Sequence, residues 1–241
     1  MDTKVKGLVL YSKDTGESDK FVTILTPNIG KIFFKARGVK KANSKLKSFV
    51  QSFSFCDYEL NEKNGNYTLT GAQSIESFFG LTTDLDKYNI GCVVLETLDK
   101  ICMYAQDYSK TFVAGLRALK FLSYSEVSSK LVFCKYLLEV FKNEGFAINT
   151  EYCSNCKKPL SNNIFFSFVE NTIVCESCRE INAINIKPAT ISAIKILNQN
   201  GYDNLKTVKL NDFILDSLFK FLTIAFCSVF ETKLKTLSLL D

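Results

Sequence analysis

Four cysteines arranged in two pairs constrain the fold of this chain more than any other feature of its sequence. Cys153 and Cys156 form the first pair, Cys175 and Cys178 form the second, and 18 residues separate the pairs. Two thiolates that are two residues apart can bind one ion, and a second such pair completes a tetrahedron. The chain has no His, so all four ligands must be thiolates. Four thiolates leave no position for water, and we therefore expect one structural Zn²⁺ per chain.

Two other uses of the paired cysteines stay open. A redox dithiol usually has a single C-x-x-C pair at a strand–helix junction, and no such context surrounds these pairs. An iron–sulfur cluster also takes four thiolates, but two pairs around a hairpin are typical of zinc ribbons. The interval holds Lys157 and Lys158 but also Glu170 and Glu176, which favours a module that only stabilises itself over one that binds a polyanion.

The remaining cysteines stand alone among apolar neighbours, and we interpret them as core thiols: Cys56, Cys92, Cys102, Cys134 and Cys227. The N-terminal residues lack the apolar core of a signal peptide, so we expect the thiols to be reduced in the cytoplasm. The most apolar window, residues 213–230, contains Asp216 and Lys220. It predicts a buried helix and no membrane partner.

Several enzyme classes are excluded by composition. Without His there is no Ser-His-Asp or Cys-His group and no imidazole base. Neither G-x-x-x-x-G-K-[ST] nor G-x-G-x-x-G occurs, and the acidic residues show no spacing of a two-metal nuclease. We therefore expect no enzymatic activity, with a zinc-ribbon enzyme that acts on nucleic acid through unrecognised carboxylates as the alternative.

The positive charge is concentrated in one segment. Residues 31–56 contain seven basic residues and no acidic one, whereas the rest of the chain has 23 basic and 25 acidic residues, from totals of 30 and 25. Such a patch favours a polyanionic partner over a solvated loop. The predicted DNA-binding residues are Lys31, Lys35, Arg37, Lys40, Lys41, Lys45 and Lys47. Lys outnumbers Arg here, which suits contacts with phosphates rather than base reading.

Period-two patterns predict five strands in the first 76 residues, at 5–11, 21–25, 31–37, 49–60 and 67–75. Lys63-Asn64-Gly65-Asn66 predicts a tight turn between the last two. Five short strands favour a closed barrel, because closure removes exposed edges. Aromatic residues interleave with the basic ones, but alternation sends half of them inward, so no single stacking residue is predicted.

Helical patterns begin near residue 80 and resume after the cysteine region. One apolar stripe runs from Ile90 to Ala105, and others cover residues 112–122, 127–141, 191–194 and 215–229. Ser123 and Glu126 have the spacing of a capping box, Pro188 is placed to begin a helix, and Asn211 or Asp212 to cap the last one. We expect a helical bundle that contains an inserted cysteine module.

The ordered motifs resemble one known family, the bacterial recombination mediator RecO. The matching segments are Lys6-Gly7, Gly16-Glu17-Ser18-Asp19-Lys20, Gly30-Lys31, Ala36-Arg37-Gly38, Lys45-Leu46, Glu76-Ser77-Phe78, Leu81, Asp84-Leu85, the four cysteines and Lys233-Leu234-Lys235. The resemblance covers nearly the whole chain. Each piece alone is weak, and the order of the pieces makes the match specific.

The resemblance implies an α+β protein, with a five-stranded OB-fold barrel followed by an α-helical bundle and an inserted four-cysteine zinc module. The expected domains are residues 1–80 (barrel), 81–150 (first helical part), 151–182 (zinc module) and 183–241 (second helical part). It implies a mediator that binds single- and double-stranded DNA and anneals complementary strands. Such a mediator engages RecR and the C-terminal tail of single-stranded DNA-binding protein, and helps RecA load on DNA coated with that protein. The resemblance also implies a bacterial cytoplasm and association with the nucleoid. A purely structural interaction module is the second alternative.

Overall fold

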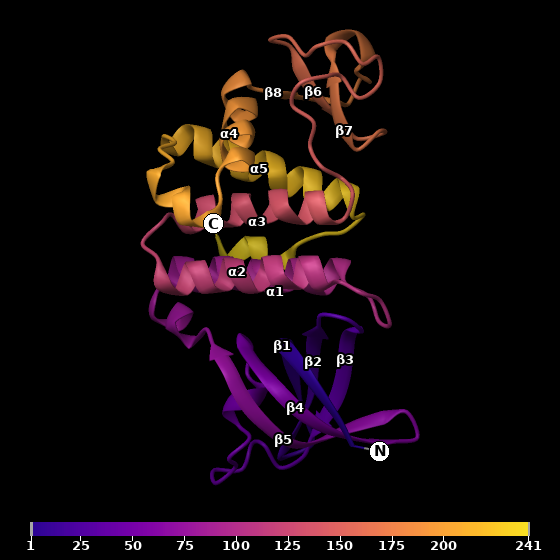
Figure 1. Cartoon of the computed structure of the whole chain (residues 1–241), viewed down its shortest axis with the longest axis vertical. Helices are drawn as coiled ribbons and strands as arrows, with labels where there is room; N and C mark the ends of the chain where they lie inside the picture. The colour runs from indigo at the N-terminus through magenta and orange to yellow at the C-terminus, as the bar shows by residue number, and fades with distance from the viewer. Residues whose placement is uncertain (1, 241) are drawn as a thin grey trace. The chain divides into compact units, whose positions relative to one another are not determined.

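The computed structural model describes residues 2–240 and forms two compact units. The first unit runs to Tyr124 and includes the chain's end from Thr236, and the second spans Ser125–Lys235. Residues 1 and 241, which open the first expected domain and close the last, lie outside the described residues. In Figure 1 the barrel and the helical segment up to residue 124 belong to the first unit, and the later helices with the cysteine module belong to the second.

A closed barrel of five strands confirms the predicted fold class. Its strands are β1 (Asp2–Thr15), β2 (Asp19–Thr26), β3 (Gly30–Ala36), β4 (Ser54–Lys63) and β5 (Asn66–Ser77). The order around the barrel is β1-β2-β3-β5-β4, and only β3 and β5 run parallel, where Phe34 lies opposite Tyr67. Inward side chains such as Ile24, Phe34 and Leu60 fill the interior, since alternate residues of each strand face the same side.

The predicted hairpin turn is confirmed, and the predicted fourth strand needs a correction. Asn64 and Gly65 have φ of 53° and 74°, the left-handed conformation that a tight hairpin turn requires. The strand expected at residues 49–60 begins only at Ser54, because Ser48–Val50 is a short 3-10 helix. Phe53 has φ of 72°, which turns the chain and buries its ring beside Gly91.

Two α-helices follow the barrel in the described part of the first unit. They are α1 (Leu85–Ile101), which contacts β1, and α2 (Ser109–Tyr124), which contacts β2. The Asp84 side chain caps α1 by accepting a hydrogen bond from the Lys87 amide at 3.0 Å. The predicted stripe extends too far, because α1 ends at Ile101 and Ala105 has φ of 57° in the loop beyond it.

The second unit packs α3 (Ser129–Asn143), α4 (Pro188–Gln199) and α5 (Asp212–Val229) against one another. Pro188 begins α4 and the Asn211 side chain caps α5, both as predicted. The Ser123–Glu126 capping box is wrong: Ser123 still belongs to α2, where its hydroxyl donates to the Leu119 carbonyl at 2.9 Å. Among the described helices, none has the length and apolar character to span a membrane.

The cysteine module is a small antiparallel sheet in the order β7-β6-β8. Its strands are β6 (Ile164–Ser167), β7 (Thr172–Cys175) and β8 (Ile184–Ile186). The β6–β7 hairpin connects the two cysteine pairs. The Phe166 ring packs edge-on against Phe221 of α5 with 5.7 Å between centroids, so the module is anchored to the helices of its own unit.

Candidate nucleic-acid interface and metal site

The four paired cysteines meet at one point of the module. Their Sγ atoms all lie within 4.8 Å of one another, and Cys156 and Cys175 are 3.7 Å apart. Thiolates bound to zinc at about 2.3 Å in a tetrahedron would be about 3.8 Å apart. Cys153 is buried and Cys156 is exposed. The set fits a tetrahedral ion and can hold a metal.

Backbone amides favour the thiolate form of one cysteine in this cluster. Burial opposes ionisation of Cys153, but the amides of Cys156, Cys175 and Asn155 together lower its pKa to about 6. The Cys175 amide lies 3.3 Å from the Cys153 sulfur. Hydrogen bonds with Cys156 and Cys175 raise the pKa of Cys178 to about 12. One thiolate is favoured and further ionisation is opposed, which is the situation that a bound cation relieves.

The side chains of strand β3 alternate between the inside and the outside of the barrel. Ile32, Phe34 and Ala36 point into the barrel and are buried. Lys31, Phe33 and Lys35 share the outer face, and Phe33 is 46% exposed. The strand therefore presents an aromatic ring between two basic side chains on the outside of the barrel.

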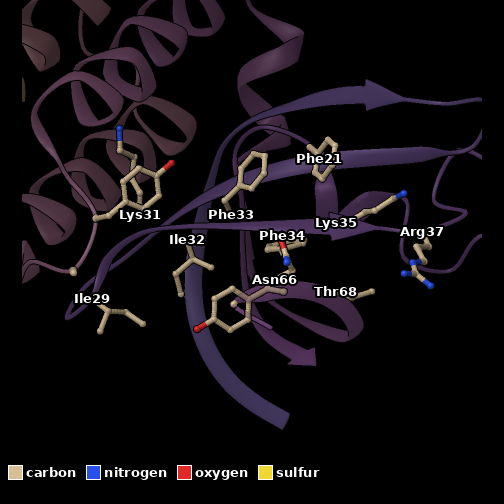
Figure 2. Close-up of a pocket in the computed structure, with 14 residues that line it drawn as sticks. Phe21, Ile29, Lys31, Ile32, Phe33, Phe34, Lys35, Arg37, Asn66 and Thr68 are labelled. Atoms are coloured by element: carbon tan, nitrogen blue, oxygen red, sulfur yellow. The ribbon is translucent and has the colours of Figure 1, made fainter. Parts of the chain in front are cut away.

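A groove of about 620 Å³ lies over this face. Figure 2 shows its labelled residues running from Ile29 and Lys31 at one end to Lys35 and Arg37 at the other. It is lined by Phe21 of β2, residues 31–35 of β3 with Ile29 and Arg37 on either side, the β4–β5 turn with the start of β5, and Tyr104 and Ala105 of the α1–α2 connection. All of these residues belong to the first unit.

Aromatic rings form much of the groove wall. Phe21 and Phe33 stack with centroids 5.1 Å apart and planes at 13°, and the Lys35 ammonium lies 6.0 Å from the Phe21 centroid. Bases can stack on such rings, and the neighbouring cations can bind phosphates. The groove thus has the composition of a site for single-stranded nucleic acid.

The seven predicted DNA-binding residues fall into different environments. Lys31, Lys35 and Arg37 line the groove, whereas the four lysines of the following loop do not. Lys31 is paired with Asp99 at 3.2 Å, Lys35 with Asp19 at 3.0 Å, and Lys40 with Asp14 at 2.6 Å. The other four of the seven are exposed and have no ion pair within residues 2–240: Arg37, Lys41, Lys45 and Lys47.

Two aspartates hold the basic loop in place. Asp19 accepts a hydrogen bond from the Gly38 amide at 2.8 Å, and this bond, with that from Lys35, lowers the pKa of Asp19. The hydrogen bond from Lys40 lowers the pKa of Asp14. The Lys40 amide also donates to the Ser18 carbonyl at 2.9 Å. The start of the loop is therefore fixed to the β1–β2 turn.

Sequence reasoning missed Phe21 and Tyr104 as groove residues. The alternation Ile32-Phe33-Phe34 could have singled out Phe33, because its neighbours are needed inside the barrel. Phe21 could then follow from the β2–β3 pairing, in which it lies opposite Lys35. No local signal marks Tyr104, which comes from the helical part of the chain.

A closed barrel of this strand order, followed by helices and a module whose four thiols could hold a metal ion, defines an OB-fold protein with a four-cysteine module. Residues 1–78 match the family model described as Recombination protein O N terminal, and residues 82–237 match Recombination protein O C terminal. The chain belongs to the recombination protein O family, and its role is in DNA repair and recombination.

Similar proteins cover nearly the whole chain. A DNA repair protein RecO of Clostridium perfringens is 27% identical over 234 residues, 97% of this chain and 95% of that protein. One of Clostridium novyi is 25% identical over 238 residues, 99% and 93% of the two chains. One of Caldicellulosiruptor bescii is 28% identical over 210 residues, 86% and 84%.

Proposed function

We propose that this protein is a recombination mediator that binds single- and double-stranded DNA, anneals complementary strands and helps RecA load on DNA coated with single-stranded DNA-binding protein, together with RecR. The observation that carries the proposal is the groove, where Phe21 and Phe33 are stacked beside Lys35 and Arg37. Bases stack on such rings whatever their sequence, and the cations follow the backbone.

The basic loop supplies a second contact for DNA. Lys41, Lys45 and Lys47 are exposed and lie outside the groove lining, so they remain for phosphates of another strand or of a duplex. Two strands held on neighbouring cationic surfaces repel each other less, and pairing then needs no nucleotide hydrolysis. The protein acts in this proposal by binding alone, without enzymatic chemistry.

Zn²⁺ is the ion we propose for the four thiolates, one per chain. Cys153, Cys156, Cys175 and Cys178 would hold it, and a site closed by four thiolates supplies structural stability rather than a bound nucleophile. The buried cluster beneath it is small, consisting of Cys153, Phe165 and Val174 with partly buried neighbours. A bound metal would stabilise this side of the sheet, which has little core of its own.

A cleft in the second unit suits the acidic tail of single-stranded DNA-binding protein. It has a volume of about 350 Å³, with Ile184, Ile186, Phe221 and Ile224 as apolar lining and Lys187 and Lys220 as cations. The Lys187 ammonium lies 4.0 Å from the centroid of Phe213, which is 64% exposed. Apolar side chains and carboxylates of one peptide would both find partners there.

Fluorescence anisotropy with single-stranded DNA across a salt series tests the central proposal. Each phosphate contact contributes about 0.7 to the slope of log affinity against log salt. Lys35→Ala with Arg37→Ala should reduce that slope by about 1.4. Lys110→Ala with Lys120→Ala removes the same charge from α2, outside the groove, and should leave the slope unchanged.

Annealing of complementary strands at low salt gives the second readout. Changing Lys35, Arg37, Lys40 and Lys41 to Ala should slow it, and unaffected annealing would contradict the mechanism. Magnesium-dependent turnover of DNA or ATP would instead favour a nucleic-acid-processing enzyme. Negligible DNA affinity at all salt concentrations would favour a structural interaction module.

A further inference from the structure

The α1–α2 connection contributes to the groove and is hydrogen-bonded to the barrel. The Lys31 amide donates to the Met103 carbonyl at 3.1 Å, and the Ala105 amide donates to the Ile29 carbonyl at 3.1 Å. Gly30 and Tyr104 form an isolated antiparallel bridge. The connection therefore pairs with the start of β3. The other end of β3 pairs with β5, at Phe34 and Lys35.

The approach of the two backbones at this point is close. Gly30 has φ of 67°, and a Cβ placed on it would lie 2.1 Å from the Met103 carbonyl oxygen. Farther along, the Tyr108 amide donates to the Pro27 carbonyl at 2.9 Å. With the connection held on both sides, Tyr104 has a fixed place on the groove wall.

The Tyr104 side chain lies beside the Lys31 ammonium and is open to solvent. It is 55% exposed, and the Lys31 ammonium lies 5.5 Å from its ring centroid. The same ammonium is bound by the Asp99 carbonyl at 2.8 Å and by its carboxylate at 3.2 Å. A cation occupies only one face of a ring, so the other face of Tyr104 remains for a ligand.

We propose that Tyr104 is a base-stacking residue that lengthens the groove beyond the barrel and makes it prefer single-stranded over double-stranded DNA. The proposal rests on the proposed function of the same groove. The faces of bases are accessible in a single strand, whereas inside a duplex both faces are covered by neighbouring pairs. Lys31, whose charge is satisfied by Asp99, acts here as a positioning residue for the ring.

The test uses the full chain and a single-stranded oligonucleotide of about 12 nucleotides that carries 2-aminopurine, whose fluorescence falls when it stacks. Tyr104→Ala should weaken single-strand binding about tenfold and raise the fluorescence of the bound strand at saturating protein, while the quenching by Phe21 and Phe33 remains. Affinity for a long blunt duplex should stay unchanged. Tyr104→Phe should behave as the original protein. Tyr124→Ala is the control, because Tyr124 is 66% exposed and outside the groove lining.

Two results would overturn the role of Tyr104. One is Tyr104→Ala binding and quenching the single strand as the original protein does. The other is an equal loss for single strand and duplex with a lower Tm, which would mean a structural role. If Lys35→Ala with Arg37→Ala leaves DNA binding intact, the proposed function of the groove fails instead. The two failures are distinguishable, because Lys35→Ala with Arg37→Ala leaves Tyr104 in place, whereas Tyr104→Ala leaves both cations in place.

Discussion

The side chain of Lys31 joins the barrel to helix α1 through Asp99. Its ammonium lies 2.8 Å from the Asp99 carbonyl oxygen and 3.2 Å from the Asp99 carboxylate. The Lys31 side chain is only 13% exposed. A basic residue in this position is tied to protein acceptors before DNA arrives, so its first contribution is to the structure of the first unit.

Replacing Lys31 should therefore affect stability more than phosphate binding. Lys31→Ala leaves two α1 acceptors without a partner, and we expect a loss of about 1–3 kcal/mol in the free energy of unfolding. Lys35→Ala, whose side chain is 36% exposed, should cost less stability but lower the salt dependence of DNA binding. Urea unfolding of both variants measures this difference. Equal stability of the two variants would contradict it.

Gly30 provides a sharper test of the contact between β3 and the α1–α2 connection. Gly30→Ala places a methyl group 2.1 Å from the Met103 carbonyl oxygen, in addition to the strain of φ at 67°. Gly16→Ala has nearly the same strain, with φ of 60°, and no atom within 4 Å. We expect Gly30→Ala to lower stability by about 2 kcal/mol more than Gly16→Ala, because one of the two backbones must move. Thermal unfolding of the pair checks it.

The sequence predicts the barrel well because its signals are local. Alternation defines the strands, and Asn64-Gly65 defines the hairpin between β4 and β5. The ends of the elements are less predictable, as at Phe53 and Ala105, where positive φ interrupts an apolar pattern that continues in the sequence. Tertiary packing decides those positions, and periodicity does not record it.

The charge of the candidate site was also only partly predictable from the sequence. No acidic residue occurs within residues 31–56. In the fold, however, acidic residues from other segments lie beside them. Antiparallel pairing of β2 with β3 brings Lys20 opposite Ala36, which places Asp14 and Asp19 beside the basic loop. Asp99 reaches Lys31 from a helix 68 positions away. The four-cysteine cluster was predictable because its ligand spacing is itself local.

Removal of any one paired thiol should abolish metal binding. Cys156→Ser leaves three thiolates for a tetrahedral ion, and we expect the bound zinc to fall from about one per chain to none. The free energy of unfolding should fall by about 4 kcal/mol or more, as is typical when a structural metal is lost. Zinc released by a thiol-modifying reagent measures the stoichiometry.

Cys92→Ser is the matched control for the metal. Cys92 is a half-buried thiol of α1, in the other unit, and burial raises its pKa. Its substitution should leave the zinc content unchanged. A Cys156→Ser protein that still holds one zinc ion would mean that the four thiols are not the ligands.

DNA binding should be almost independent of pH between 6 and 8. The chain has no His, and the pKa values of Asp14 and Asp19 are lowered by their hydrogen bonds from Lys40 and from Gly38. A carboxylate whose folded pKa lies below its unfolded value stabilises the fold above that unfolded value, near 4, and loses this contribution as the pH falls through the folded pKa. The fixed loop therefore stays intact at neutral pH and loosens only in acid.

Anisotropy at constant ionic strength and pH 6, 7 and 8 should accordingly give one affinity. Asp19→Asn should weaken DNA binding at all three pH values, because the amide holds Lys35 and the Gly38 amide less well than a carboxylate does. A steep change of affinity between pH 6 and 8 would show that a group other than these aspartates governs the interface.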